Sequence, residues 1–316
     1  MFRCRRTCLV SCTLLLLIFL FHTGLADNPQ ATQPDCASGL TGEYLGQSTP
    51  GLDPVRFAPL SLRATSTEWW VSAPVFSAAG DLAIWTRYHV GNPDYKDLAF
   101  VERQASGCWT QPEALPSGGN PHDAHAAFQP GTDTLFIISD RPGGPLFRAE
   151  RTRDGWTESV PVPISLPFKM GHQITIARNG TLYFRMTNDE NMDLYRSVLL
   201  DGQYVAPESL GPTINTADYE YGPYVSPAED FILFASNRPG GYGKTDLYVS
   251  FRTPGGNWDH PVNLGSSINT VYPETLPFIT LDGEYLFFIS RRSGDTMYNP
   301  YWVSTEVIER LRPSDG

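Results

Sequence analysis

Two stretches of the sequence decide the fold: residues 224–234, Tyr-Val-Ser-Pro-Ala-Glu-Asp-Phe-Ile-Leu-Phe, and residues 278–288, Phe-Ile-Thr-Leu-Asp-Gly-Glu-Tyr-Leu-Phe-Phe. Each stretch consists of an apolar pair, a polar turn and an apolar run, which is the pattern of two strands joined by a tight turn. The same pattern recurs at residues 75–85, 127–137 and 174–184, at intervals of roughly 50 residues. The chain therefore contains five copies of one structural unit.

The remainder of each unit repeats as well. A Ser-Asp-Arg-Pro-Gly-Gly loop follows the second strand at residues 139–144, a Ser-Asn-Arg-Pro-Gly-Gly loop follows it at 236–241, and residues 290–294 are a looser copy. A short third strand and a fourth apolar segment come next, as at 246–248 and 261–265. Four short strands joined by turns and repeated at this length are typical of the blades of a β-propeller.

The N-terminal part of the chain is expected to complete the last unit. The fifth unit ends after its third strand, near Arg312 and Pro313, whereas residues 57–62, Phe-Ala-Pro-Leu-Ser-Leu, resemble the fourth segment at 261–264. An N-terminal strand that joins the last blade closes the ring and removes exposed sheet edges. We therefore predict an all-β fold, a single propeller of five four-stranded blades, or of six blades if residues 36–56 contain a further partial blade.

The composition agrees with a turn-rich all-β protein and excludes several other classes. The 316 residues include 28 Gly, 27 Pro and 12% aromatic residues, whereas only 18% are charged. The aromatic content argues against intrinsic disorder, and the abundance of Gly and Pro argues against a long coiled coil. The net charge of -11 has the opposite sign to that of most nucleic-acid binders, so no nucleic-acid partner is expected.

The N-terminus has the three parts of a secretory signal peptide. Three arginines among the first six residues precede an apolar stretch, densest over residues 14–21, and Gly24-Leu25-Ala26 supplies small residues before a cleavage point. The apolar stretch is shorter than the ~20 residues of a membrane-spanning helix. We therefore expect a signal peptide at 1–26, a lead segment at 27–55 and a propeller domain at 56–313. The protein would be exported, periplasmic or extracellular, with no integral membrane segment after cleavage.

Removal of this leader leaves two cysteines, Cys36 and Cys108. The leader contains three arginines and no acid, so its removal also takes the net charge from -11 to -14. An even number of cysteines in an exported protein favours a disulfide, with two separate thiols as the alternative. The closing strand would begin on the same face as the turn at 107–109, where the two cysteines can meet. We predict a Cys36–Cys108 disulfide that locks the ring.

The repeated units resemble the WD-repeat-like propeller repeats of the TolB type. Those repeats run Ser-Pro-Asp-Gly, an aromatic strand, Ser-Asn-Arg-Pro-Gly-Gly and Asp-Leu-Tyr, and residues 226–248 follow this order. The resemblance covers residues 56–313 and is specific in the fourth and fifth units. It is degraded in the first three, and the third has Met-Thr-Asn-Asp-Glu at 186–190 in place of the Arg-Pro-Gly-Gly loop. The resemblance implies a propeller fold but no single activity, because propellers serve both as binding modules and as enzymes.

A candidate binding site is expected at one end of the central channel. In a propeller, the loops that enter the inner strands share one face with the loops between second and third strands; we call this face the mouth. Convergent polar groups at such an opening are the default candidates for ligand binding. The predicted ligand-binding residues are Glu68, Asp123, Glu220 and Glu274 at the strand entrances, His122, His125 and His172 near them, and Arg141, Arg238 and Arg292 in the loops. They predict a polar, acidic mouth that favours cationic or polar partners.

Each of these residues also has a structural interpretation. Arg238 can form a pair with Asp246 within one blade. Glu220 and Glu274 can accept backbone N–H groups at the strand entrances. His122 and His125 suit a metal, but two histidines without a fixed partner favour hydrogen-bonded loop residues. No metal and no other cofactor is therefore predicted.

The sequence favours binding over catalysis. It contains no Gly-x-Ser-x-Gly, His-Glu-x-x-His or phosphate-loop motif, and no catalytic residue is assigned. The main expectation is a monomeric binding or scaffold protein for a peptide, a protein or a glycan. The alternative is a sialidase-like glycoside hydrolase, because residues 154–157, Asp-Gly-Trp-Thr, loosely resemble a sialidase turn. Its carboxylate pair would come from Asp123, Glu220 and Glu274. A structural member of a cell-envelope complex is the third hypothesis.

Overall fold

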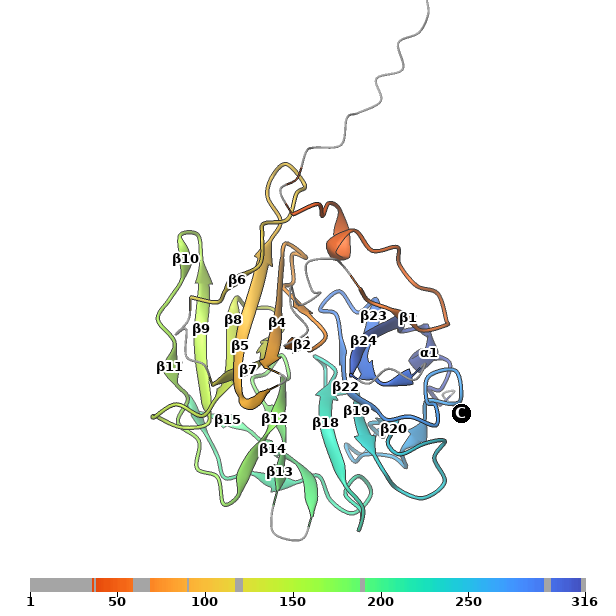
Figure 1. Cartoon of the computed structure of the whole chain (residues 1–316). Coiled ribbons are helices and arrows are strands. Elements are labelled where there is room, and N and C mark those ends of the chain that lie inside the picture. Colours follow the sequence, from red (N-terminus) through yellow and green to blue (C-terminus); the bar gives the residue numbers. More distant parts are fainter. Residues whose placement is uncertain are drawn as a thin grey trace, which may run out of the picture. The chain divides into compact units, whose positions relative to one another are not determined.

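The computed structural model describes residue 36 and residues 38–58, 69–89, 91–116, 122–187, 191–292 and 297–313. These residues form five small antiparallel sheets arranged as the blades of a propeller (Figure 1). The predicted all-β fold with five blades is confirmed, and the six-bladed alternative is wrong. The predicted signal peptide and Glu68 lie outside the described residues. Within the described residues, no helix is long and apolar enough to cross a membrane.

Each blade runs from an inner strand, which lines the channel, to an outer strand. Blade 1 contains β2 (Trp69–Val71), β3 (Val75–Phe76), β4 (Leu82–His89), β5 (Asn92–Glu102) and β6 (Glu113–Ala114). Blade 2 contains β7 (Asp123–Phe128), β8 (Thr134–Ser139), β9 (Leu146–Thr152), β10 (Gly155–Trp156) and β11 (Val160–Pro161). In blade 1 both β2 and β3 pair with β4, and in blade 2 both β10 and β11 pair with β9.

The other three blades have the simple order of four strands. Blade 3 contains β12 (Lys169–Ile176), β13 (Leu182–Thr187), β14 (Met192–Ser197) and β17 (Glu208–Ser209), with a separate hairpin of β15 (Leu199–Leu200) and β16 (Gln203–Tyr204). Blade 4 contains β18 (Glu220–Val225), β19 (Phe231–Ser236), β20 (Asp246–Phe251) and β21 (Val262–Asn263). Blade 5 contains β22 (Glu274–Ile279), β23 (Tyr285–Ser290), β24 (Asn299–Ser304) and the N-terminal β1 (Val55–Arg56). A 3-10 turn (Glu43–Gly46) precedes β1, and the short helix α1 (Glu306–Glu309) follows β24.

Local hydrogen bonds explain the polar turn between the first two strands of each repeat. In blade 4 the Ser226 N–H donates to the Phe231 carbonyl, and the Ser226 hydroxyl accepts from the Phe231 N–H and donates to Asp230. In blade 5 Thr280 takes the place of the serine, and its hydroxyl donates to Asp282. Short hydroxyl and carboxylate side chains bond to the backbone of their own turn in this way, so the turn residues fix the pairing of the apolar runs beside them.

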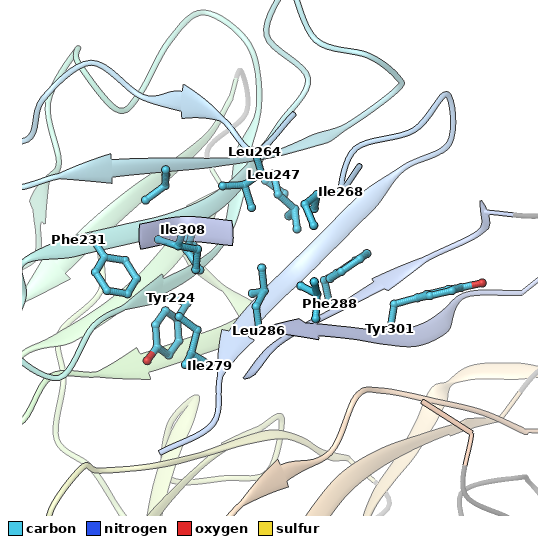
Figure 2. Close-up of a cluster of buried hydrophobic side chains, with 14 of the residues drawn as sticks. Tyr224, Phe231, Leu247, Leu264, Ile268, Ile279, Leu286, Phe288, Tyr301 and Ile308 are labelled. Atoms are coloured by element: carbon cyan, nitrogen blue, oxygen red, sulfur yellow. The ribbon is translucent and has the colours of Figure 1, made fainter. Parts of the chain in front are cut away.

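The hydrophobic core is divided among the interfaces between neighbouring blades. Figure 2 shows the interface of blades 4 and 5, where Leu247 and Leu264 of blade 4 pack with Leu286 and Phe288 of blade 5. The helix α1 adds Ile308 to the same cluster. All five side chains are at most 5% exposed, and burying side chains of this size stabilises the fold by roughly 1.5–3 kcal/mol each. Each blade is thus held mainly by its neighbours.

The ring closes where β1 joins the last blade. β1 pairs antiparallel with β24, and Val55 lies opposite Trp302. The next N–H along the chain, that of Phe57, donates to the Pro300 carbonyl over 2.9 Å, as the N–H of Leu264 donates to the third strand of blade 4. Phe57 therefore takes the position that Leu264 has in blade 4. The predicted closure by an N-terminal strand is confirmed.

The residues that form this strand differ from those expected from the sequence. The apolar pattern predicts that residues 57–62 correspond to 261–264. In the structure, the pairing with β24 begins at Val55 and reaches Phe57. Phe57 decides the register because it is 1% exposed and its ring packs against those of Phe287 and Trp302. The pattern of apolar and polar residues does not show whether Phe57 or one of the leucines that follow it makes this contact.

The lead segment before β1 crosses the seam between blades 5 and 1. The Trp109 N–H of blade 1 donates to the Leu40 carbonyl, and the Trp109 indole N–H donates to the Gly42 carbonyl over 2.8 Å. Leu45 is completely buried in a cluster that combines residues of blade 1 with Phe287 and other residues of blade 5. The Cys36–Cys108 disulfide, with Cα atoms 5.4 Å apart, ties the segment to the same turn and confirms the predicted pairing.

We expect reduction of this disulfide to lower the free energy of unfolding by about 2–5 kcal/mol. The bond spans 72 residues, so opening it enlarges the unfolded ensemble and releases the lead segment from blade 1. Urea denaturation with and without reductant measures the change. The Cys36→Ser/Cys108→Ser double variant has no bond to reduce and is the control. Equal urea midpoints before and after complete reduction of the wild-type protein would contradict the expectation.

Candidate functional site: the mouth of the channel

The mouth face is formed where the inner strands begin and the second strands end. Antiparallel pairing places the start of each inner strand beside the end of the second strand, as with Glu220 opposite Ser236 in blade 4 and Glu274 opposite Ser290 in blade 5. The loops that join second to third strands, such as 237–245, therefore lie at this face. The charged residues predicted at the strand entrances and in these loops are thus neighbours.

Blade 4 holds a completely buried carboxylate at its strand entrance. Glu220 accepts from the Thr216 N–H and hydroxyl, both at 2.8 Å, from the Ser236 hydroxyl at 2.9 Å and from Arg238 Nη2 at 3.1 Å. Its side chain is 0% exposed. Arg238 Nη2 also donates to the Ile214 carbonyl over 2.7 Å, and the guanidinium lies over two aromatic rings of its own blade. The cluster joins the entrance, the second strand and the following loop.

Blade 5 repeats this cluster. Glu274 accepts from the Thr270 N–H at 2.8 Å, from the Thr270 and Ser290 hydroxyls at 2.7 Å each, and from Arg292 Nη2 at 3.4 Å, and it too is 0% exposed. The same contacts in two blades support a role in holding the strand entrances. A ligand could reach either carboxylate only by displacing an arginine. Ligand binding by these glutamates and arginines stays a prediction that their enclosure does not favour.

Arg238 pairs with a different acid from the one expected. Asp246, the expected partner, accepts from the backbone N–H groups of Tyr242 and Gly243 and from the side-chain amide of Asn263. The expected pairing of Arg238 with Asp246 is therefore wrong. Arg238 turns to Glu220 because a completely buried carboxylate needs a compensating cation, whereas backbone N–H groups satisfy Asp246.

Blade 2 has a looser version of the cluster. Asp123 lies opposite Ser139, and Arg141 Nε is 3.7 Å from Asp123 Oδ1. Arg141 Nη2 instead donates to the Ser159 hydroxyl over 2.8 Å. Aspartate is one methylene shorter than glutamate, so it does not reach the arginine as closely. Burial raises the pKa of Asp123 above its usual range, while the Ser139 hydroxyl and the charge of Arg141 act in the opposite direction.

Blade 3 breaks the pattern. Met170 lies opposite Met186 at the positions that Glu220 and Ser236 occupy in blade 4, and both methionines are buried. The residue before Met186 is Arg185, whereas the same position in blades 2, 4 and 5 holds Ile138, Ala235 and Ile289. Blade 3 has thus replaced a buried charged cluster by an apolar pair and has placed a cation next to it.

The Arg185 guanidinium lies across the inner strand of blade 3. A Cβ atom on Gly171 would be 2.4 Å from Arg185 Nε and 2.9 Å from Nη2, so only glycine leaves room for the guanidinium. Nη1 donates to the Met192 sulfur at 3.4 Å, which is a weak acceptor, and Nε is buried without a hydrogen bond. Burial lowers the pKa of Arg185, and the neighbouring Tyr221 opposes this effect; the group remains charged at neutral pH. Among the described residues, none forms an ion pair with Arg185.

The five inner strands enclose a cavity of about 90 Å³ along the channel, lined mainly by apolar side chains. Four of these strands, β7, β12, β18 and β22, bulge close to the mouth. In three of the bulges, His125 (φ 45°), Gly222 (φ 62°) and Leu276 (φ 53°) adopt the left-handed region. Bulges bend a strand and redirect its side chains. A Cβ on Gly222 would be 3.2 Å from the Leu276 backbone nitrogen, so blades 4 and 5 approach closely at this level.

Gln173 spans the channel at the same level. Its Nε2 donates to the Pro277 carbonyl of blade 5 over 2.9 Å, and its Oε1 lies 2.9 Å from the Cβ position of Gly222 in blade 4. Gln173 Oε1 and Thr275 Oγ1 are both buried without a hydrogen bond. Residues of blades 3, 4 and 5 therefore meet at the mouth with polar atoms left unpaired.

The three histidines predicted at the mouth take separate positions. His125 Nε2 forms a hydrogen bond with the Tyr88 hydroxyl, and the His125 N–H donates to Thr86 Oγ1 over 2.9 Å. His122 forms a backbone bridge with blade 1. His172 belongs to β12, and its side chain lies outside the described part of the structure. The described residues contain no group of three or more potential metal ligands.

The mouth carries cations as well as the predicted acids. All three lysines of the chain, Lys96, Lys169 and Lys244, lie near inner-strand entrances or second-to-third strand connections. Lys96 is buried, and its Nζ is 3.4 Å from the Asp140 carboxylate. Since the buried glutamates have their own arginines, the net negative charge of the chain does not make the mouth uniformly acidic.

Exposed aromatic side chains also gather at the mouth. Within the described part of the chain, the exposed aromatic residues are five, each 38–51% exposed: Tyr95, Phe168, Tyr219, Tyr242 and Tyr272. Tyr95 lies near the start of the third strand β5 of blade 1, and the other four lie beside an inner-strand entrance or in a second-to-third strand connection of blades 3, 4 and 5. Other exposed apolar residues, such as Leu199 and Leu200 in the third-to-fourth strand connection of blade 3, are aliphatic.

These residues were not among those predicted from the sequence. Arg185 could have been found by aligning the five units on their strand register, because it replaces a residue that is apolar in blades 2, 4 and 5. The exposed tyrosines carry no such signal, since tyrosine also fills the core of this protein at Tyr183 and Tyr224.

Several solved structures resemble the chain at low similarity. The NanB sialidase from Streptococcus pneumoniae aligns with a TM-score of 0.39 and 15% identity over 66% of this chain and 35% of its own. XC5397 from Xanthomonas campestris, described as a gluconolactonase, aligns with a TM-score of 0.46 and 12% identity over 81% and 87%. A thermostable family-43 glycoside hydrolase aligns with a TM-score of 0.43 and 10% identity over 76% and 90%.

The chain spans only 35% of the NanB sialidase chain. No family model and no curated protein matches the chain. Likeness at this level leaves the function to be argued from the residues of the mouth.

We expect Arg238→Met to lower the free energy of unfolding by about 3–5 kcal/mol, because it leaves Glu220 buried without its cation. Adding Glu220→Gln to the variant should recover part of this loss. The matched control is Arg310→Met, which breaks an exposed i,i+4 pair with Glu306 and should cost less than about 0.5 kcal/mol. Urea denaturation of the four proteins measures the differences. Similar losses for the Arg238 and Arg310 variants would show that the buried cluster does not hold the strand entrance.

Proposed function

We propose that this chain is an exported propeller that binds a protein, a peptide or a glycan at its mouth face. The observation that carries the proposal is the position of the exposed aromatic side chains, which lie at the mouth face of blades 1, 3, 4 and 5. Tyrosine and phenylalanine offer a large rigid contact area at a low cost in side-chain entropy, and aromatic residues are enriched where proteins recognise partners. Charged groups of both signs lie between them and can provide specificity.

Export is supported by two independent features. The first 26 residues have the charge, apolar and small-residue parts of a signal peptide. The Cys36–Cys108 disulfide is of the kind that persists in oxidising compartments. The resemblance of residues 226–248 to TolB-type repeats agrees with an exported propeller and adds no particular ligand.

The geometry favours binding over glycoside hydrolysis. A glycoside hydrolase needs two carboxyl groups that face each other across an open cleft. Glu220 and Glu274 are each enclosed by a threonine, a serine and an arginine of the same region, and Asp123 is 4% exposed. The turn at 154–157 joins third and fourth strands of blade 2, which places it at the face opposite the mouth.

We expect the double variant Tyr242→Ala/Tyr272→Ala to weaken ligand binding by about tenfold or more, because truncating aromatic anchors commonly costs over 1 kcal/mol each. Arrays of peptides and of glycans, probed with the purified wild-type protein, identify the ligands on which the variant is then compared. The control is Leu199→Ala/Leu200→Ala, which removes exposed apolar side chains of the opposite face. Unchanged binding by the tyrosine variant, or an equal loss in the leucine variant, would contradict binding through the mouth.

A further inference from the structure

Three polar atoms without a hydrogen bond belong to neighbouring segments of the mouth. They are Arg185 Nε and Gln173 Oε1 of blade 3 and Thr275 Oγ1 of blade 5, all buried without a hydrogen bond. Arg185 lies over Gly171, two residues before Gln173, and its charge interacts with Tyr221 of blade 4. Tyr221 in turn lies next to Thr275. Buried polar groups in folded proteins nearly always have partners, so their convergence points to a ligand.

We propose that these groups form a subsite for a carboxylate that carries an adjacent hydroxyl or N–H group. Arg185 binds the carboxylate, and Gln173 Oε1 accepts a hydrogen bond from the adjacent donor of the ligand. The Thr275 hydroxyl flanks the same space. The subsite rests on the proposed binding function of the mouth and adds the chemistry of the ligand.

The guanidinium selects a carboxylate for geometric and electrostatic reasons. Its planar array of N–H groups matches the two oxygens of a carboxylate, and Nε is one of the donors left unpaired. Elsewhere in the mouth, Arg238 and Arg292 are each occupied by a buried glutamate of their own blade. In blade 3 the equivalent acid is replaced by Met170, and Arg185 stands at a position that is apolar in blades 2, 4 and 5, so this cation has no carboxylate at its own strand entrance.

Because of the Gln173 amide, the ligand also needs a hydrogen-bond donor next to its carboxylate. Its Nε2 donates to the Pro277 carbonyl, which fixes the orientation of the amide and leaves Oε1 as an acceptor. Oε1 faces Gly222, where any larger residue would fill the space. The Arg185 guanidinium lies over Gly171, and Gln173 comes two residues later in β12. A ligand carboxylate bound by Arg185 therefore has the Gln173 Oε1 acceptor on the same strand.

Among the residues that the structure describes, no acid forms an ion pair with Arg185. Asp193 belongs to the third strand of blade 3, where burial and the charge of Glu220 raise the pKa of Asp193 above its usual range. Burial lowers the pKa of Arg185, and Tyr221 opposes this effect.

Two sources of such a carboxylate are an acidic sugar, whose donors are hydroxyls, and the C-terminus of a peptide, whose donor is an amide N–H. Glucuronic acid and N-acetylglycine represent the two sources, and glucose and N-acetylglycinamide are their neutral analogues. Titration of the full-length processed protein with each compound, followed by NMR or calorimetry, should detect binding of at least one acid and weaker binding of its neutral analogue. The acid that binds identifies the source.

We expect Arg185→Gln to weaken binding of that acid by about 10- to 100-fold, the usual effect of losing a charge-assisted hydrogen bond. Gly171→Ala should weaken it as well, because the new methyl group displaces the guanidinium without changing the charge. The backbone of Gly171 is not in the left-handed region, so alanine is compatible with the fold there. Arg153→Gln, an equal change of charge at an exposed turn of the opposite face, should bind as the wild type does. Urea midpoints verify that each variant is folded, and Gly171→Ala serves as the test if Arg185→Gln is not.

The proposal is overturned if neither acid binds, if the neutral analogues bind equally well, or if the folded variants bind as tightly as the wild type. These outcomes are distinguishable from failure of the proposed function. Tyr242 and Tyr272 are exposed residues of blades 4 and 5 and are not part of the subsite. Loss of array binding in the tyrosine variant with retained acid binding leaves the subsite standing. Array binding without any acid binding leaves only the mouth as a recognition face.

Discussion

Each blade of this propeller buries its apolar faces against two neighbours, so the fold exists only if blades 1 and 5 meet. The chain meets this constraint with its N-terminal segment. Residues 40–45 pack on the turn of blade 1, β1 completes blade 5, and the disulfide ties the start of the segment to Cys108. Closure leaves no open edge at the seam, and it positions the five inner strands around one channel.

The charged residues of the strand entrances in blades 4 and 5 have a structural role. Glu220 and Glu274 each gather a threonine, a serine and an arginine, and so connect an inner strand to the second strand and to the loop that follows it. Removing one partner from such a buried cluster is costly, which explains why the motif repeats with the blades. The groups that we propose for recognition, namely the exposed aromatic residues and the unpaired polar atoms of blade 3, lie outside these clusters.

Blade 3 differs from the other blades at the strand entrance, where Met170 and Met186 replace the charged cluster. A sequence that agrees with its fold at every level is expected to break local rules mainly at functional or strained positions. Met170 and Met186 keep the interface packed after the loss of the charged cluster, while Gly171 makes room for Arg185. The bulge near Gln173 brings its amide across the channel to blade 5. This irregular blade thus contributes Arg185 and Gln173 to the buried polar groups of the mouth that have an atom without a hydrogen bond.

The sequence by itself determined the repeat, because turn chemistry and the alternation of apolar runs are local properties. It also predicted closure by an N-terminal strand and a Cys36–Cys108 disulfide, and it favoured five blades while leaving six open. It also located the charged residues at the strand entrances. Only the tertiary structure decided which of them have a structural role. The burial of Glu220 and its ion pair with Arg238 depend on contacts between residues of different strands and loops. The same is true of the register of β1, which is fixed by the packing of Phe57. An alignment of the repeats singles out Arg185, but only tertiary contacts place its guanidinium over Gly171. Residues with the same local sequence pattern thus have different partners in the folded chain, because the partners come from segments that are distant in the sequence.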